Sequence, residues 1–66
     1  MQIRDLTQSE ADYLQIVCNF TDDENTLFEL RLQKVPLEEC AERMSVSVPT
    51  VKRISKRVND KIQREL

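Results

Sequence analysis

The chain has 66 residues, enough for one small hydrophobic core, and we therefore expect a single domain spanning residues 1–66. Charged residues make up 33% and apolar residues 39%, a balance typical of a folded globular domain. Glycine is absent and proline occurs twice, which excludes glycine-rich phosphate loops and disfavours the tight hairpins of all-β folds. The composition therefore predicts an all-α fold.

The residue types also limit the chemistry that the chain can perform. Histidine, the usual general base at neutral pH and the commonest metal ligand, is absent. We therefore predict no catalytic residues, no metal and no cofactor. Cys18 and Cys40 form no CxxC pair, and we expect reduced thiols packed as small apolar side chains, with one disulfide as the alternative. No apolar run approaches the ~20 residues of a membrane span, so we expect a cytoplasmic protein without membrane contact.

Charge is distributed unevenly along the chain. Residues 1–44 carry four basic and ten acidic side chains, whereas residues 45–66 carry six basic and two acidic ones. The net charge of −2 therefore conceals a basic C-terminal segment. Such a segment on an acidic domain is typical of a surface that faces a polyanion.

A capping box predicts the start of the first helix. Thr7 is followed three residues later by Glu10, so that each side chain can bond a free backbone N–H at the helix start. Apolar residues then recur at helical spacing: Ala11, Leu14, Val17 and Cys18. We expect this helix over about residues 7–19, with Tyr13 at the edge of the core rather than serving as a stacking platform.

A second capping box, Thr21 with Glu24, predicts that another helix begins at once. This helix should stop near Lys34, because a residue before proline is pushed out of the α region. Pro36 suits the start of a third, short helix over about residues 37–44, since its missing N–H costs nothing in a first turn.

The last predicted helix is the longest. Ser47 is its expected N-cap, Pro49 lies in its opening turn, and it should run to about Gln63. Four residues spaced by three, four and four positions form one narrow apolar stripe: Val51, Ile54, Val58 and Ile62. The sequence thus predicts a compact four-helix domain whose last two helices form a helix-turn-helix.

The residues of this segment also resemble a known family. Small or hydrophobic residues occupy the positions that the motif requires: Cys40, Ala41, Met44, Val46, Val51 and Ile54. Together with the blocks Phe20–Glu24, Leu27–Leu30 and Thr50–Arg53, they make about residues 20–62 similar to LuxR-type regulators and to the promoter-reading fourth region of sigma factors. Ser45 stands where those families usually have glycine, Cys40 where they usually have isoleucine, and Pro36 where a polar helix cap is common. The first helix, about residues 7–19, lies outside the shared blocks.

The resemblance implies a sequence-specific double-stranded DNA-binding protein in transcriptional regulation, from a bacterium, a phage or a mobile element. Its recognition helix, about residues 48–62, would enter the major groove. Because the apolar stripe faces the core, five of the expected contact residues lie on or near the opposite arc: Ser47, Pro49, Thr50, Arg53 and Arg57. Lys52 and Lys56 are expected to flank that arc. We expect Arg53 and Thr50 to contact bases, and Lys52, Lys56 and Arg57 to contact phosphates.

The sequence is also compatible with several alternatives. The apolar stripe continues through Val58, Ile62 and Leu66, an edge that could form a homodimer with DNA half-sites about one helical turn apart. The acidic first half either keeps the chain soluble or docks onto another protein. The main alternative function is accordingly a helix-turn-helix fold that serves as an interaction module for RNA polymerase or another regulator. An enzyme is not expected.

Overall fold

Four helices form in the part of the chain that the computed structural model describes, residues 5–65, and those residues contain no strand. They are α1 (Gln8–Val17), α2 (Asp22–Leu32), α3 (Leu37–Met44) and α4 (Val48–Glu65). The prediction of an all-α, four-helix domain is confirmed. The bounds of α3 agree with the prediction, whereas α2 ends at Leu32 rather than near Lys34 and α4 continues to Glu65.

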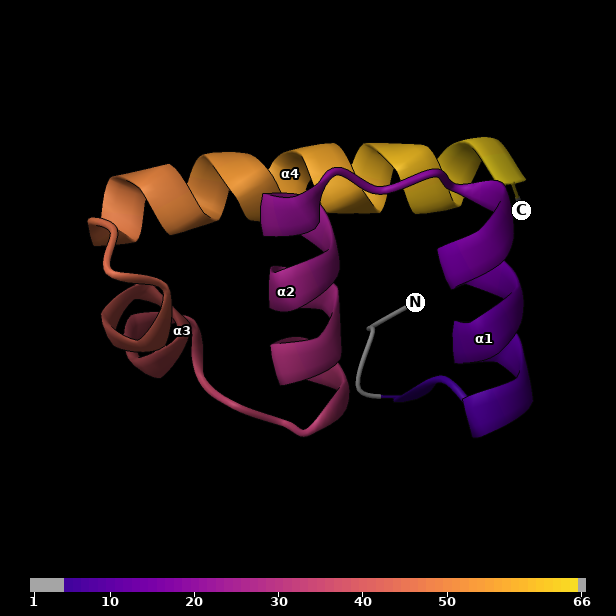
Figure 1. Cartoon of the computed structure of the whole chain (residues 1–66), viewed down its shortest axis with the longest axis horizontal. Helices are drawn as coiled ribbons and strands as arrows, with labels where there is room; N and C mark the ends of the chain where they lie inside the picture. The colour runs from indigo at the N-terminus through magenta and orange to yellow at the C-terminus, as the bar shows by residue number, and fades with distance from the viewer. Residues whose placement is uncertain (1–4, 66) are drawn as a thin grey trace.

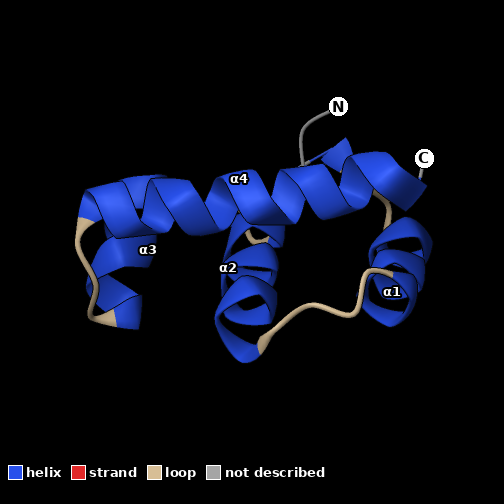
Figure 2. Ribbon diagram, turned by 90° about the horizontal axis from the view of Figure 1, so that it is seen from above, coloured by secondary structure: helices blue, strands red, loops and turns tan. Residues whose placement is uncertain are grey.

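Helix α4 supports the other three helices. Figure 1 shows α3 beneath the N-terminal end of α4, α2 beneath its middle and α1 beneath its C-terminal end, and all three pack against it. Figure 2, seen from above, shows α4 lying across them. At ~1.5 Å per residue, an 18-residue helix is ~27 Å long, so α4 spans nearly the whole 29 Å length of the domain. The radius of gyration, 11.0 Å, matches the ~11 Å typical of a folded chain of this size.

Both predicted capping boxes are present. Thr7 N–H donates to Glu10 Oε1 at 2.9 Å, and Glu10 N–H donates to Thr7 Oγ1 at 3.2 Å. Thr21 N–H donates to Glu24 Oε1 at 3.0 Å, and Glu24 N–H donates to Thr21 Oγ1 at 3.4 Å. Each pair satisfies two backbone donors that have no partner within the helix, which fixes where α1 and α2 begin.

The first three helices end at residues with left-handed backbones, and glycine is at none of them. Their φ angles are 51°, 65° and 58° at Asn19, Lys34 and Ser45 respectively. After α2, Lys34 N–H donates to Arg31 O at 3.0 Å and Val35 N–H donates to Leu30 O at 3.1 Å. These two bonds form a Schellman motif, which ends α2 before the chain reaches Pro36.

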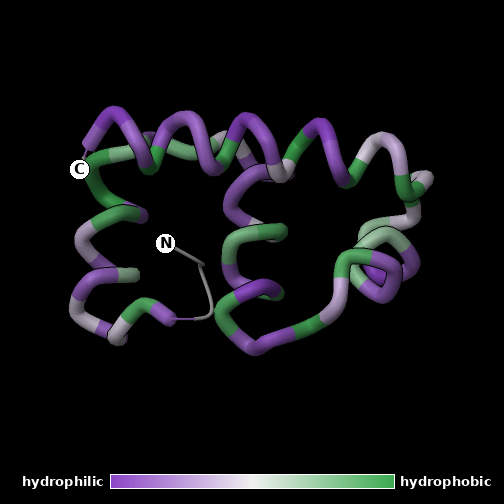
Figure 3. The backbone as a smooth tube through the Cα atoms, turned by 180° about the vertical axis from the view of Figure 1, so that it is seen from behind, coloured by the Kyte–Doolittle hydropathy of each residue, from purple (hydrophilic) through white to green (hydrophobic). Residues whose placement is uncertain are grey.

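The core lies between α4 and the other helices. In Figure 3, hydrophobic segments recur along α4 between hydrophilic ones, as expected of a helix with one buried stripe. The rings of Phe20 and Phe28 pack with centroids 5.1 Å apart. The buried apolar residues are Ala11, Leu14, Cys18, Leu27, Phe28, Val35, Cys40, Ala41, Val51, Ile54, Val58 and Ile62.

The predicted apolar edge for a homodimer is not found. Val58 is fully buried and Ile62 is 6% exposed, because the other helices already cover the stripe of α4. Leu66, the third residue of that edge, lies outside the described residues. Val58 and Ile62 therefore belong to the core of a single chain and cannot form the seam of a dimer.

Cys18 and Cys40 are buried and not bonded to each other, which confirms the prediction of packed, reduced thiols. Burial raises the pKa of both thiols, and at Cys18 the Glu65 carboxylate adds to this effect. In residues 5–65 no helix is both long and apolar enough for a membrane span.

Candidate nucleic-acid interface

The turn between α3 and α4 consists of Ser45, Val46 and Ser47. Ser45 has φ 58° and ψ 41°, the left-handed conformation that a glycine would adopt with less strain. Ser45 N–H donates to Glu42 O at 3.2 Å, and Val46 N–H donates to Ala41 O at 3.0 Å. This second Schellman motif reverses the chain in a few residues, so that α3 packs against the start of α4.

Ser47 caps the N-terminus of α4, as predicted. Its Oγ accepts the backbone N–H of Thr50 at 3.3 Å, and its carbonyl oxygen accepts that of Val51 at 3.1 Å. The hydroxyls of Ser47 and Thr50 also bond each other at 2.9 Å. Ser47 is exposed, but Thr50 is half-buried, so its expected position on or near the arc opposite the core is corrected to the flank of α4. Because a hydroxyl has one donor and two acceptor positions, the pair keeps hydrogen-bonding capacity toward solvent.

An exposed basic arc occupies the outer side of the first half of α4. Pro49, Lys52, Arg53 and Lys56 are all exposed. On a helix with ~3.6 residues per turn, Pro49 and Lys56 lie nearly opposite the buried stripe, and Arg53 and Lys52 flank them on either side. In residues 5–65 the structure gives the three basic side chains of this arc no ion-pair partner. They are therefore directed to solvent, as predicted from the sequence.

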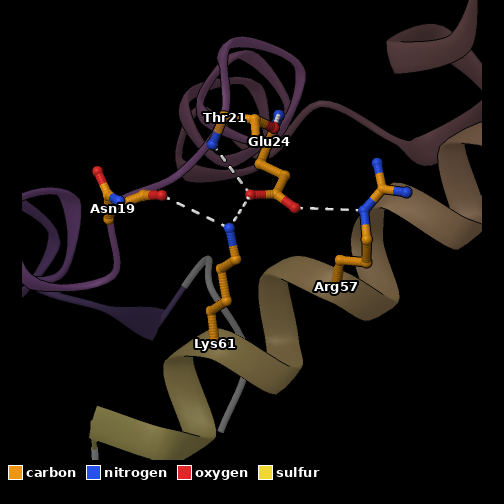
Figure 4. Close-up of polar contacts among 5 residues, drawn as sticks. All are labelled: Asn19, Thr21, Glu24, Arg57 and Lys61. Atoms are coloured by element: carbon orange, nitrogen blue, oxygen red, sulfur yellow. Dashed lines mark hydrogen bonds and ion pairs between the residues drawn. The ribbon is translucent and has the colours of Figure 1, made fainter.

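Arg57 is placed differently from the prediction. Its side chain is 57% exposed, but its Nε donates to Glu24 Oε2 at 3.2 Å, at the side of α4 that faces α2 (Figure 4). The expected position on or near the arc opposite the core is thus corrected to the flank of α4. This contact restrains the orientation of the Arg57 side chain, and the outer end of the guanidinium points away from Glu24.

Glu24 is the buried polar residue that holds this flank in place. Its carboxylate is 2.5 Å from Lys61 Nζ, which also donates to the carbonyl oxygen of Asn19 at 3.5 Å (Figure 4). Burial acts to raise the pKa of Glu24, but the hydrogen bonds from Lys61 and Thr21, with the charge of Lys61, outweigh it and lower that pKa. The charged carboxylate therefore ties α2 and the connection before it to the second half of α4.

Sequence reasoning assigned only the capping box to Glu24 and missed its contacts with α4. The available signal was the spacing of Arg57 and Lys61, four residues apart and beside the apolar stripe. Two basic side chains at that spacing lie on one side of a helix and can reach one carboxylate.

Positive charge is concentrated at the end of α4 that lies over α3. Residues 48–57 contain four basic and no acidic side chains, whereas residues 58–65 contain two of each. The positive field along the outer side of α4 therefore comes mainly from the half beside the turn, whereas α3 below that half carries the exposed carboxylates of Glu38 and Glu42. A polyanion would be attracted to the outer side of α4 rather than to α3.

No protein-family model, curated protein or solved structure matches the chain. Among residues 5–65, no three His, Cys, Asp or Glu side chains form a group that could hold a metal ion. The candidate interface is therefore defined by the positions and charges of the residues described above.

Proposed function

We propose that this chain binds double-stranded DNA sequence-specifically and acts in transcriptional regulation, with α4 as the recognition helix in the major groove. The likeness of residues 20–62 to LuxR-type and sigma-factor segments supports a bacterial, phage or mobile-element regulator that acts in the cytoplasm. The proposal assigns the chain no catalytic role.

One observation carries the proposal: the exposed basic arc lies on a helix whose opposite side is anchored in the core and whose N-terminus follows a tight turn. Val51 and Ile54 are 0% and 3% exposed, so the backbone that bears Arg53 is fixed by packing. The major groove admits one α-helix, and helix-turn-helix proteins read bases with the N-terminal residues of that helix. The side chains on that part of α4 are basic and exposed, which suits contact with DNA.

The side chains of the arc suit different roles. Arg53 is exposed and without an ion-pair partner in the described residues, and a guanidinium can bond O6 and N7 of guanine together. Thr50 offers a hydroxyl to a neighbouring base, with its position fixed by Ser47. Lys52 and Lys56 are flexible point charges suited to phosphates beside the groove. Pro49 adds a rigid apolar surface on the same side of α4, in its first turn.

Arg57 is proposed for a phosphate contact on the α2 side, with its direction set by Glu24. Counting Arg57 with Lys52 and Lys56 gives about three phosphate contacts. For B-DNA, the logarithm of affinity falls by ~0.9 per neutralised phosphate for each tenfold rise in salt, which predicts a slope of about −3. A single domain should therefore bind weakly at physiological salt and needs a further contact for useful affinity.

The test is selection from random duplexes at low salt, followed by titration of the enriched duplex at two salt concentrations. Arg53→Ala should relax selection at one base pair and cost ~1–3 kcal/mol on the preferred site. Lys56→Ala should weaken all duplexes alike and reduce the salt slope by about one.

Arg64→Ala is the matched control, because Arg64 is an exposed basic residue at the other end of α4. It removes the same charge but should change affinity by less than about twofold, since it lies outside the arc. An equal loss of affinity in all three variants would show nonspecific charge attraction instead of specific recognition. Absence of binding by the wild type at low salt would refute the proposal.

A further inference from the structure

The outer face of α1 carries the exposed large hydrophobic side chains of residues 5–65. Ile16 is 78% exposed and Tyr13 is 54% exposed. The same helix buries Ala11 and Leu14 against the core, so these two apolar residues are not part of its packing. Tyr13 was expected at the edge of the core, and this expectation is corrected, because Tyr13 is exposed and is not among the apolar side chains that pack against the core.

Tyr13 and Ile16 lie together on the helix. They are three residues apart, a spacing that places side chains next to each other on one face, and Asp12 lies four residues before Ile16 on the same side. A β-branched residue also lowers helix propensity, and an exposed one gains little from burial. Ile16 therefore contributes less to folding than a lysine or glutamate would at the same position.

This apolar pair lies in the acidic part of the chain, with the exposed Asp12 beside it on the same face of α1. Residues 5–30 contain seven acidic and no basic side chains. Glu24 is buried and paired with Lys61 and Arg57, whereas the other six acidic residues are exposed. A binding partner for this face must supply positive charge as well as apolar surface.

A second copy of the chain fits this requirement poorly. Pairing the face with itself would bring Asp12 and Glu10 of the two copies together, and like charges repel. The basic arc of α4 offers positive charge, but its outer side chains other than Pro49 are charged. DNA is disfavoured because its phosphates would meet exposed carboxylates.

We propose that the outer face of α1, formed by Ser9, Asp12, Tyr13 and Ile16, docks a basic amphipathic segment of another protein. Aliphatic side chains of that segment pack on Ile16 and Tyr13, while its lysines or arginines pair with Asp12 and Glu10, and an arginine can stack on the Tyr13 ring. Figure 1 shows α1 at the end of the domain opposite α3, so this face and the turn before α4 point to different surroundings. The inference goes beyond DNA binding and does not depend on it.

The experiment is display selection of helical 16-residue peptides on the wild-type protein, with counter-selection on Ile16→Lys. Enriched peptides should combine lysine or arginine with aliphatic residues at helical spacing. A synthetic peptide of the consensus sequence is then titrated against wild type, Ile16→Lys and Thr26→Lys. Thr26 is an exposed residue of α2, so the last variant adds the same charge to the acidic half away from the outer face of α1.

Ile16→Lys should weaken binding of the peptide by about tenfold or more, because it removes a packing contact. Thr26→Lys should weaken binding by about twofold or less, because it only adds a positive charge away from the docking face. The proposal is overturned if no peptide prefers the wild type, if enriched peptides are not basic, or if both variants lose equally. Concentration-dependent self-association abolished by Ile16→Lys would also overturn it, in favour of a second copy. DNA titrations of Ile16→Lys should match wild type, so failure of the DNA proposal and failure of this one are distinguishable.

Discussion

Replacing Glu24 with glutamine tests whether the buried carboxylate holds α4 in place. Glu24→Gln keeps the shape of the side chain and an oxygen that can accept the Thr21 N–H, but it removes the negative charge opposite Lys61 and Arg57. Two basic side chains then face a neutral group. The variant should fold into the same four helices with lower stability.

The expected loss follows from the exposure of the partners. Removing one member of a fully buried ion pair costs ~3–5 kcal/mol. The Lys61 side chain is 26% exposed and that of Arg57 is 57% exposed, so both cations recover part of their hydration. We therefore expect a loss of ~2 kcal/mol, most of it from Lys61. A chain of this length has a total stability of only ~3–10 kcal/mol, so the loss is a large fraction of it.

The measurement is urea denaturation followed by far-ultraviolet circular dichroism. With m of ~1 kcal/mol/M, the urea midpoint should fall by ~2 M, and Tm should fall by ~8–16 °C. The double variant Glu24→Gln with Lys61→Gln should lose less than the sum of the single variants, because their effects share one contact.

Glu29→Gln is the matched control. Glu29 is an exposed residue of the same helix, and a glutamine oxygen can still accept the bond from Asn25. Its free energy of unfolding should stay within about 0.5 kcal/mol of that of wild type. An unchanged midpoint for Glu24→Gln, or an equal loss in Glu29→Gln, would refute the assigned role of the buried carboxylate.

Three further predictions follow from the titrating groups and the turns. Because the pKa of Glu24 is lowered in the folded state, the contribution of Glu24 to stability is present above about pH 4.3 and is lost as pH falls through its folded-state pKa. The urea midpoints of wild type and Glu24→Gln should therefore converge in acid. A difference between the two midpoints that stays constant down to about pH 3 would contradict this. Ser45→Gly should raise stability by ~1 kcal/mol through relief of the left-handed backbone, and a lower Tm would show that the serine side chain contributes more than that strain. Cys18 and Cys40 should react with a maleimide only on unfolding, so labelling should rise with urea as helix is lost; rapid labelling in native buffer would argue against their burial.

The features predicted correctly depend on groups that are close in the sequence. The capping boxes of α1 and α2 each involve two residues three positions apart, and the inner stripe of α4 repeats at helical spacing. The exposed positions of Lys52, Arg53 and Lys56 follow from that stripe by geometry alone. Local periodicity is sufficient for all of these because one helix determines them.

The features that the sequence left open or missed depend on which helices meet. The stripe through Val58 and Ile62 looks identical whether a second copy or another helix of the same chain covers it, and no pattern in α1 states that it packs under the end of α4. Glu24 meets its partners across 33 and 37 residues, a distance at which no local pattern operates. The end of α2 was placed late because Lys34, rather than a glycine, adopts the left-handed turn.

The attachment of all three other helices to one side of α4 also affects how this domain can evolve. A small domain with a few kcal/mol of stability tolerates few costly substitutions, and the inner stripe of α4 is where such costs arise. Arg53 and Lys56 of the outer arc are exposed, so exchanges at these two positions leave the stability of the fold almost unchanged. Substitutions on the outer side of α4 can therefore change what the helix contacts, while the residues on its inner side keep the stability of the fold constant.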